Sequence, residues 1–229
     1  MMIIVSLLIG VLLLAVIGCN EPTPTQEPTP QVKPVETVKT TPEPTQAKVA
    51  LILVDIQNDY FPGGRNPLRE PEKAAEQARV ALDYFREHRL PLFHIQHISL
   101  YEGATFLLPD TDGIKTHDTV KPASGEPIIL KHYPDSFFQT ELHEKLSALG
   151  IKRLVICGMM THMCIDTTVR AAKNHGYEVV LLSDACTTRD LTWENNEIPA
   201  ETVHNTFMAA LQGRFAKIIK ANEIDATLK

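Results

Sequence analysis

From about residue 48 onward, short apolar runs alternate with stretches of helical periodicity. Continuous apolar runs bounded by turn signals are typical of strands that are buried on both faces of a sheet. Between them, apolar residues recur every three to four positions, as on one face of a helix. This pattern predicts strands over 49–55, 92–98, 127–131, 152–157, 178–183 and 215–219, and helices over 71–89, 139–149, 164–175 and 200–212.

The alternation predicts an α/β fold. Strands that alternate with helices form a parallel sheet with helices on both faces. We expect a doubly wound, mostly parallel six-stranded sheet in the order 3-2-1-4-5-6. Where such an order reverses, between strands 1 and 4, a crevice opens at the carboxyl ends of the strands. Asp55 ends strand 1 and Cys164 lies just past strand 4. The two residues are therefore expected on opposite lips of one cleft.

The chain divides into three parts. Residues 1–18 are uncharged and largely apolar, and Val16-Ile17-Gly18-Cys19 is similar to a lipobox. We predict a lipoprotein signal peptide over 1–19 with lipidation of Cys19; an uncleaved anchor helix is the alternative. Residues 20–47 are rich in Pro and Thr and are expected to be a disordered linker. The globular domain is predicted over 48–229, anchored to a membrane outside the cytoplasm.

Charge and cysteine content narrow the functional classes. The net charge of −6 argues against a nucleic-acid partner. Four cysteines without paired spacing indicate neither a zinc knuckle nor a disulfide framework. Cys157, inside a strand, is expected in the core, and Cys186 in the core or the cleft wall.

Cys164 is the candidate nucleophile. It follows a turn with a glycine at its start and opens a helix. A helix N-terminus favours an anion, so the position predicts a thiol that loses its proton readily. The alternative is a small core cysteine.

Asp55 and Lys131 both end strands, so they are candidate partners of that cysteine. Asp55 would take the thiol proton, and Lys131 would stabilise negative charge. The backbone N–H groups of Thr161 and Cys164 would form an oxyanion hole. The structural alternative is that the aspartate forms a turn and the lysine is merely solvated.

Histidines and polar residues near these positions suggest no metal. His94 and His97 are three apart in a strand and therefore point to opposite faces, so only His97 is expected at the cleft. His204, on the last predicted helix, is read as a packing histidine. Gln57 and Asp59 are expected to serve the turn after strand 1.

Several motifs resemble the isochorismatase-like cysteine hydrolase family. They are DIQNDY at 55–60, KHYPDSF at 131–137, CGMMTHMCIDTTVRAA at 157–172 and DACTTRD at 184–190, and the resemblance spans about 48–220. It implies a catalytic triad of Asp55, Lys131 and Cys164. It also implies a cis peptide between Met160 and Thr161. Tyr60 stands where the family usually has Phe.

Differences within that family bear on the reaction. Nicotinamidases carry a metal-binding Asp-x-His after strand 2, and the matching positions here are His97 and Ser99. Isochorismatases proper lack the cysteine. The chain is most similar to amide-cleaving, streptothricin-hydrolase-like members.

The expected activity is therefore cleavage of a C–N amide bond in a small molecule through a thioester on Cys164, without cofactor or metal. A nicotinamidase-type amidase and a non-catalytic surface binding protein are the alternatives. The family is compatible with a homo-oligomer. Two long loops, 100–118 and 191–199, are expected to shape the pocket. Its predicted residues are Gln57, Tyr60, His97, Phe137, Met160 and Trp193.

Overall fold

The computed structural model describes residues 48–229. The predicted signal peptide, the lipidation site Cys19 and the linker over 20–47 lie outside the described residues. Among residues 48–229, no helix is both long enough and apolar enough to cross a membrane.

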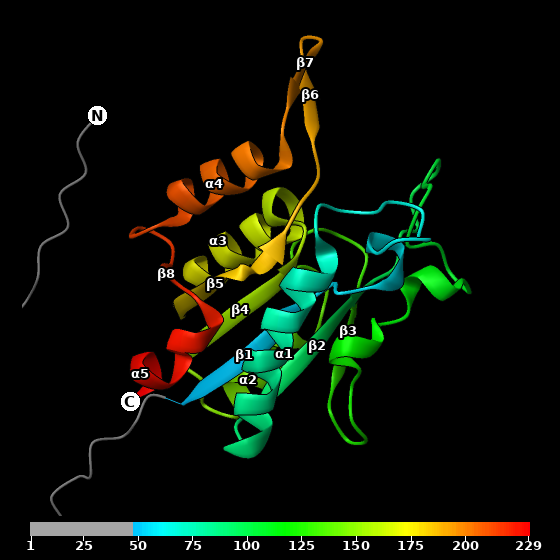
Figure 1. Cartoon of the computed structure of the whole chain (residues 1–229). Helices are drawn as coiled ribbons and strands as arrows, with labels where there is room; N and C mark the ends of the chain where they lie inside the picture. Colours follow the sequence, from blue (N-terminus) through cyan, green and yellow to red (C-terminus); the bar gives the residue numbers. More distant parts are fainter. Residues whose placement is uncertain (1–47) are drawn as a thin grey trace, which may run out of the picture. The chain divides into compact units, whose positions relative to one another are not determined.

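Six parallel strands form the central sheet, in the order β3-β2-β1-β4-β5-β8, which confirms the predicted order (Figure 1). β1 and β4 are neighbours, so the reversal of strand order falls where the sequence placed it. All six residues of β1 are buried, as a strand covered on both faces requires. The strands are β1 (Val49–Val54), β2 (Leu92–His97), β3 (Ile128–Lys131), β4 (Arg153–Met159), β5 (Glu178–Thr187) and β8 (Lys217–Ile219).

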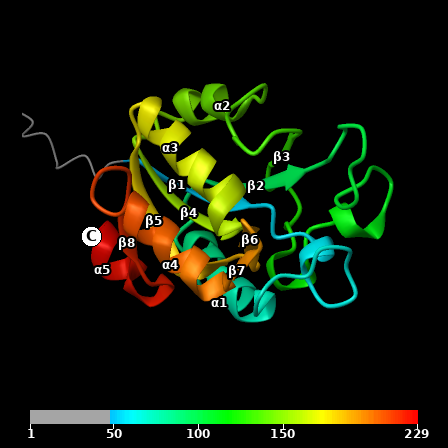
Figure 2. The same cartoon turned by 90° about the horizontal axis from the view of Figure 1, so that it is seen from above.

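Helices cover both faces of this sheet. α1 (Pro71–Glu87) lies on one face, and α2 (Leu142–Ala148) and α3 (Asp166–Asn174) lie on the other (Figure 2). α4 (Ala200–Leu211) packs beside α3, and α5 (Ile224–Leu228) ends the chain. On α1 the predicted apolar face, which includes Leu82 and Phe85, is buried. Each of these two side chains contributes roughly 2–3 kcal/mol by leaving water.

Two regions differ from the sequence prediction. β5 continues past Ser183 to Thr187, because Cys186 and Thr187 pair with the end of β4. The loop that follows contains a hairpin of β6 (Leu191–Trp193) and β7 (Asn196–Ile198). Glu194 and Asn195, at its turn, both have positive φ, as a two-residue hairpin turn requires. The sequence lacks the glycine that usually signals such a turn.

Candidate active site at the carboxyl edge of the sheet

Four adjacent strands bring four polar side chains together at one edge. Asp55 follows β1, His97 ends β2, Lys131 ends β3, and Cys164 lies beyond β4. A carboxylate oxygen of Asp55, a ring nitrogen of His97 and the sulfur of Cys164 all lie within 4.8 Å of one another. The parallel order explains the meeting, since carboxyl ends of neighbouring strands share an edge.

Asp55 and Lys131 form a buried ion pair. Lys131 Nζ lies 2.7 Å from Asp55 Oδ2, and both side chains are fully buried. The ammonium also donates to the carbonyl oxygens of Tyr133 and Pro134, at 3.0 and 3.2 Å. Burial lowers the pKa of Lys131, but the neighbouring Asp55 carboxylate and Cys164 sulfur outweigh this effect and raise it overall. Lys131 is therefore a permanent cation in this site.

Cys164 lies in the π turn (Thr161–Ile165), which runs directly into α3. The expected lowered pKa is wrong. Burial raises the pKa of Cys164 to about 12, the Asp55 carboxylate adds to this shift, and Lys131 opposes it. Desolvation of a thiol that is only 3% exposed outweighs the helix dipole. The resting cluster thus contains a neutral thiol beside a carboxylate.

The Asp55 carboxylate is short of hydrogen-bond donors. Apart from its contacts with Lys131 and the Cys164 thiol, no group within residues 48–229 donates to either of its oxygens. Asp55 also has φ of +50°, an uncommon backbone conformation that is found at strained functional positions. A buried carboxylate with spare lone pairs can accept a proton from a nearby thiol.

His97 is a neutral member of the cluster. Its Nδ1 lies 3.2 Å from Lys131 Nζ and accepts from it, which places the imidazole proton on Nε2. Burial lowers the pKa of His97 to about 4, with Lys131 contributing to the shift and Asp55 opposing it. His97 was the histidine expected beside Asp55 and Cys164, and the structure places it there, in a buried cluster. His94 instead contacts Glu126 at 2.9 Å.

The cluster does not suit a metal ion. The Nδ1 lone pair of His97 and one oxygen of Asp55 already bind the Lys131 ammonium. A cation added there would sit beside a fixed positive charge. Ser99, at the position of the expected second ligand, is buried, and its N–H donates to Leu107 O.

The π turn presents backbone donors near the thiol. Thr161 begins the helical segment, and within residues 48–229 its N–H donates to no group. The cis peptide lies between Met159 and Met160, one residue before the predicted Met160–Thr161 bond. The prediction was wrong because the strand ends at Met159 and helical geometry begins at Thr161, which puts the change of direction at Met160.

Gly158 allows this turn to approach Asp55. A Cβ atom at Gly158 would lie 1.9 Å from the carbonyl oxygen of Val54, the residue before Asp55. Gly158 also has φ of +131°, which side chains disfavour. Only glycine lets the ends of β1 and β4 come this close.

Three predicted pocket residues lie in or beside the cluster. Tyr60 is buried; burial raises its pKa, and the nearby Cys164 and Asp55 add to this shift. Met160 adjoins the π turn and is buried. Gln57 is buried and donates to His97 O while accepting from His97 N, at 2.9 and 2.8 Å. The Gln57 amide therefore fixes the end of β2.

Two predicted pocket residues lie elsewhere. Phe137 stacks on Tyr177 and packs against His175, beyond the far end of α3 from Cys164. Trp193 is 70% exposed on the β6–β7 hairpin, which projects from the body of the domain (Figure 1). Phe137 was assigned from its position in a motif and Trp193 from its position in the long loop 191–199, and neither position gives side-chain direction.

The loop between β2 and β3 is tied to the turn after β1. Asp59, which is buried, accepts from Arg65 N at 3.1 Å and from Leu107 N at 2.6 Å. The Asp59 carboxylate lies so close to Gly113 that a Cβ atom added to Gly113 would be 2.2 Å from Asp59 Oδ1. The expected role of Asp59 in the turn after β1 is confirmed, and through Leu107 its carboxylate also holds the long loop.

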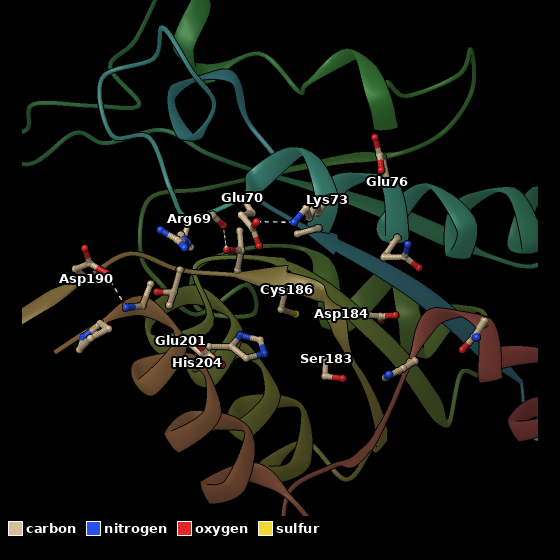
Figure 3. Close-up of a pocket in the computed structure, with 18 of the residues that line it drawn as sticks. Arg69, Glu70, Lys73, Glu76, Ser183, Asp184, Cys186, Asp190, Glu201 and His204 are labelled. Carbon is tan, nitrogen blue, oxygen red and sulfur yellow. Dashed lines mark hydrogen bonds and ion pairs between the residues drawn. The ribbon is translucent and has the colours of Figure 1, made fainter.

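A polar groove of about 960 Å³ lies beside the π turn. It separates the start of α1 from the start of α4, and charged side chains line both sides (Figure 3). Asp55, Lys131 and Cys164 are absent from its lining. His204 faces this groove and contacts Thr161 Oγ1 through Nδ1 at 3.0 Å. No sequence pattern predicts this contact, because it depends on how α4 packs.

These features define a doubly wound α/β protein with a buried, cysteine-centred site at a strand-order reversal. Residues 49–223 match the Isochorismatase domain. The chain belongs to the isochorismatase family and is an isochorismatase-family hydrolase.

Three similar proteins support this assignment. The isochorismatase family protein YddQ of Bacillus subtilis is 50% identical over 74% of this chain and 94% of its own length. A streptothricin hydrolase of Streptomyces noursei is 30% identical over 77% of this chain and 60% of its own. The crystal structure of an isochorismatase from Pseudomonas putida has a TM-score of 0.72 and 32% identity, covering 78% of this chain and 90% of that one.

Proposed function

We propose that the protein hydrolyses a C–N amide bond of a small molecule through a thioester on Cys164. The observation that carries the proposal is the buried cluster of a neutral thiol, an under-bonded carboxylate and a fixed ammonium. These groups supply a nucleophile, a base and a positive charge without metal.

The cluster suggests a sequence of steps. As the Cys164 sulfur bonds to the substrate carbonyl carbon, Asp55 accepts the thiol proton and the carbonyl electrons move to oxygen. Thr161 and Cys164 N–H groups stabilise that oxyanion, and Lys131 offsets negative charge nearby. Protonated Asp55 returns its proton to the leaving nitrogen as the C–N bond breaks. Asp55 then takes a proton from water as the water oxygen bonds to the thioester carbon. It returns that proton to sulfur as the C–S bond breaks, which releases a carboxylic acid and restores the thiol and the carboxylate.

The similar proteins favour amide chemistry. They include a streptothricin hydrolase at 30% identity and a nicotinamidase of Arabidopsis thaliana at 22%. The residues argue against the metal-dependent alternative, because His97 Nδ1 is engaged by Lys131 and Ser99 replaces a ligand. One bound metal per chain in the purified protein would favour the nicotinamidase type.

The tethering of the domain is a separate part of the proposal. The apolar segment 1–18, Cys19 and the Pro/Thr-rich linker support a lipid anchor outside the cytoplasm. At ~3.1 Å per residue, an extended linker of this length would span up to roughly 85 Å. Palmitate labelling that depends on Cys19, with release from membranes on Cys19→Ala, is the expected result. Labelling that survives Cys19→Ala would contradict lipidation there.

The catalytic part is tested with a panel of small primary and secondary amides. Release of ammonia or amine is measured for the wild type and for Cys164→Ala. We expect release by the wild type only, and acid quenching should trap an acyl group on Cys164 in mass spectra. Equal release by Cys164→Ala would overturn the mechanism. Cys164 that no substrate or acyl donor modifies would favour a binding protein.

A further inference from the structure

We infer that His204 is a positioning residue, which holds Thr161 so that its backbone N–H faces the oxyanion. The inference rests on the proposed function. It concerns a contact between α4 and the π turn, outside the Asp55–Lys131–Cys164 cluster. The juxtaposition is the 3.0 Å hydrogen bond between His204 Nδ1 and Thr161 Oγ1.

Thr161 is placed where its orientation matters. It is fully buried, is the first residue of the π turn, and has an N–H with no partner within residues 48–229. A threonine near a helix start commonly caps a backbone N–H through its hydroxyl. Here Met163 N and Ile165 N both donate to Met160 O, and the Thr161 hydroxyl contacts His204 instead.

A hydrogen bond to this hydroxyl restrains the backbone. Threonine is branched at Cβ, so its side-chain torsion is coupled tightly to the main chain. Fixing Oγ1 therefore fixes the direction of the Thr161 N–H. The next residue is held similarly, since His162 Nδ1 hydrogen-bonds Thr188 Oγ1 just beyond β5. Two consecutive residues of the turn are thus attached to different elements.

His204 is suited to a neutral structural contact. It is half-buried on α4 and faces the groove of Figure 3. Burial lowers the pKa of His204, so the imidazole is uncharged near neutral pH. A neutral ring can accept from or donate to the hydroxyl without adding charge near the thiol.

Two reagents separate positioning from the chemistry of the thiol. Iodoacetamide alkylates the sulfur: the S–C bond forms, iodide leaves, the thiol proton is lost to solvent, and no oxyanion forms. p-Nitrophenyl acetate acylates it: sulfur bonds to the acetyl carbon, Asp55 takes the thiol proton, and the oxyanion collapses to a thioester with loss of p-nitrophenolate. Only acylation needs the Thr161 N–H. Mass spectrometry locates both labels on Cys164.

We expect His204→Ala to slow acylation about 10- to 30-fold. This is a part of the roughly 10²–10³-fold rate enhancement that one oxyanion-hole donor supplies. The alkylation rate of His204→Ala should stay within about twofold of the wild type. Thr161→Val should show the same acylation and alkylation rates as His204→Ala. The double variant should acylate no more slowly than either single variant. Thr161→Ser and His204→Asn keep hydrogen-bonding groups and should retain most of the acylation rate. Glu201→Ala, on the same groove and helix, is the control and should change neither rate.

Three results would overturn the inference. They are unchanged acylation in His204→Ala, equal loss of both rates, and additive losses in the double variant. Failure of the proposed function has a different signature, namely wild-type Cys164 that is alkylated but never acylated; that result would end both proposals.

Discussion

β2 carries two histidines three residues apart, and each lies beside a carboxylate and a cation. His97 contacts Lys131, which pairs with Asp55; His94 contacts Glu126, which pairs with Arg86. The residue types are nearly the same in the two clusters. What differs is how completely each carboxylate is hydrogen-bonded.

Glu126 is fully engaged. It accepts from Arg86 at 2.7 and 2.8 Å, from His94 at 2.9 Å and from Ala123 N at 2.8 Å. The bonds from Arg86 are the main reason that the pKa of Glu126 falls to about 2. Such a group stabilises the fold and holds its charge through the physiological range.

Among residues 48–229, the Asp55 carboxylate contacts only the Lys131 ammonium and the Cys164 thiol. A buried ion pair of this kind adds little net stability, because desolvation offsets the attraction. Glu126, whose oxygens are fully hydrogen-bonded, stabilises the fold, whereas Asp55, which has few donors and lies beside a nucleophile, is available for proton transfer. Four predictions test this difference between the two carboxylates.

The largest effect is expected for Asp55→Asn. Turnover on the p-nitrophenyl acetate assay should fall by roughly 10³–10⁴, since proton transfer to a positioned base is lost. Alkylation by iodoacetamide near pH 8 should instead become faster, because the Asp55 charge raises the pKa of Cys164 while Lys131 remains to stabilise a thiolate. Rates measured from pH 6 to 10 test both parts. Slower alkylation throughout would contradict the charge balance described here.

Lys131→Met should act mainly on stability. Removing one partner of a buried ion pair leaves Asp55 unpaired and should lower the free energy of unfolding by about 3–5 kcal/mol. The double variant Asp55→Asn/Lys131→Met should recover most of this loss. Urea unfolding at pH 7 measures both. No recovery in the double variant would show that the pair itself stabilises the fold.

Much of this site was visible in the sequence. Asp55 and Lys131 each end an apolar run, Cys164 follows the turn after another, and parallel topology brings such positions to one edge. His97 could also be placed, because strand alternation separates it from His94.

Other features depend on tertiary packing. The pKa of Cys164 was predicted in the wrong direction, since local sequence shows a helix start but not the depth of burial. Phe137 was placed by its motif and Trp193 by its loop, and neither gives side-chain direction. The contact between His204 and Thr161 joins residues 43 positions apart. No local pattern in either segment predicts it.

Glu126→Gln should weaken the fold and leave the chemistry unchanged. A folded-state pKa of about 2, against an ordinary 4.5, means that ionised Glu126 stabilises the fold above pH 4.5. That stability is lost as pH falls through about 2 and corresponds to about 3 kcal/mol. At pH 7 the free energy of unfolding of the variant should be lower than that of the wild type by about 2–3 kcal/mol. Between pH 4.5 and 2 the free energy of unfolding of the variant should fall less steeply than that of the wild type. Urea titrations at several pH values test this, with Cys164 acylation as the control.

The smallest effects are expected for substitutions of the two histidines. Comparing these two variants distinguishes the Asp55 cluster from the Glu126 cluster most directly. His97→Gln removes one acceptor of the Lys131 ammonium, but Lys131 retains its contacts with Asp55 and two carbonyl oxygens. Turnover should therefore fall about tenfold or less, and the free energy of unfolding should change by no more than about 1 kcal/mol. His94→Gln keeps a donor for Glu126 and removes the buried Nδ1 that has no partner within residues 48–229. Its stability should change by less than about 1 kcal/mol.

Turnover is the readout that distinguishes the two histidine variants. It should be unchanged in His94→Gln, because His94 contacts Glu126 and lies on the opposite side of β2 from the thiol. If His94→Gln slowed acylation as much as His97→Gln, the two clusters would be coupled through the strand. The distinction between a structural and a reactive carboxylate would then fail.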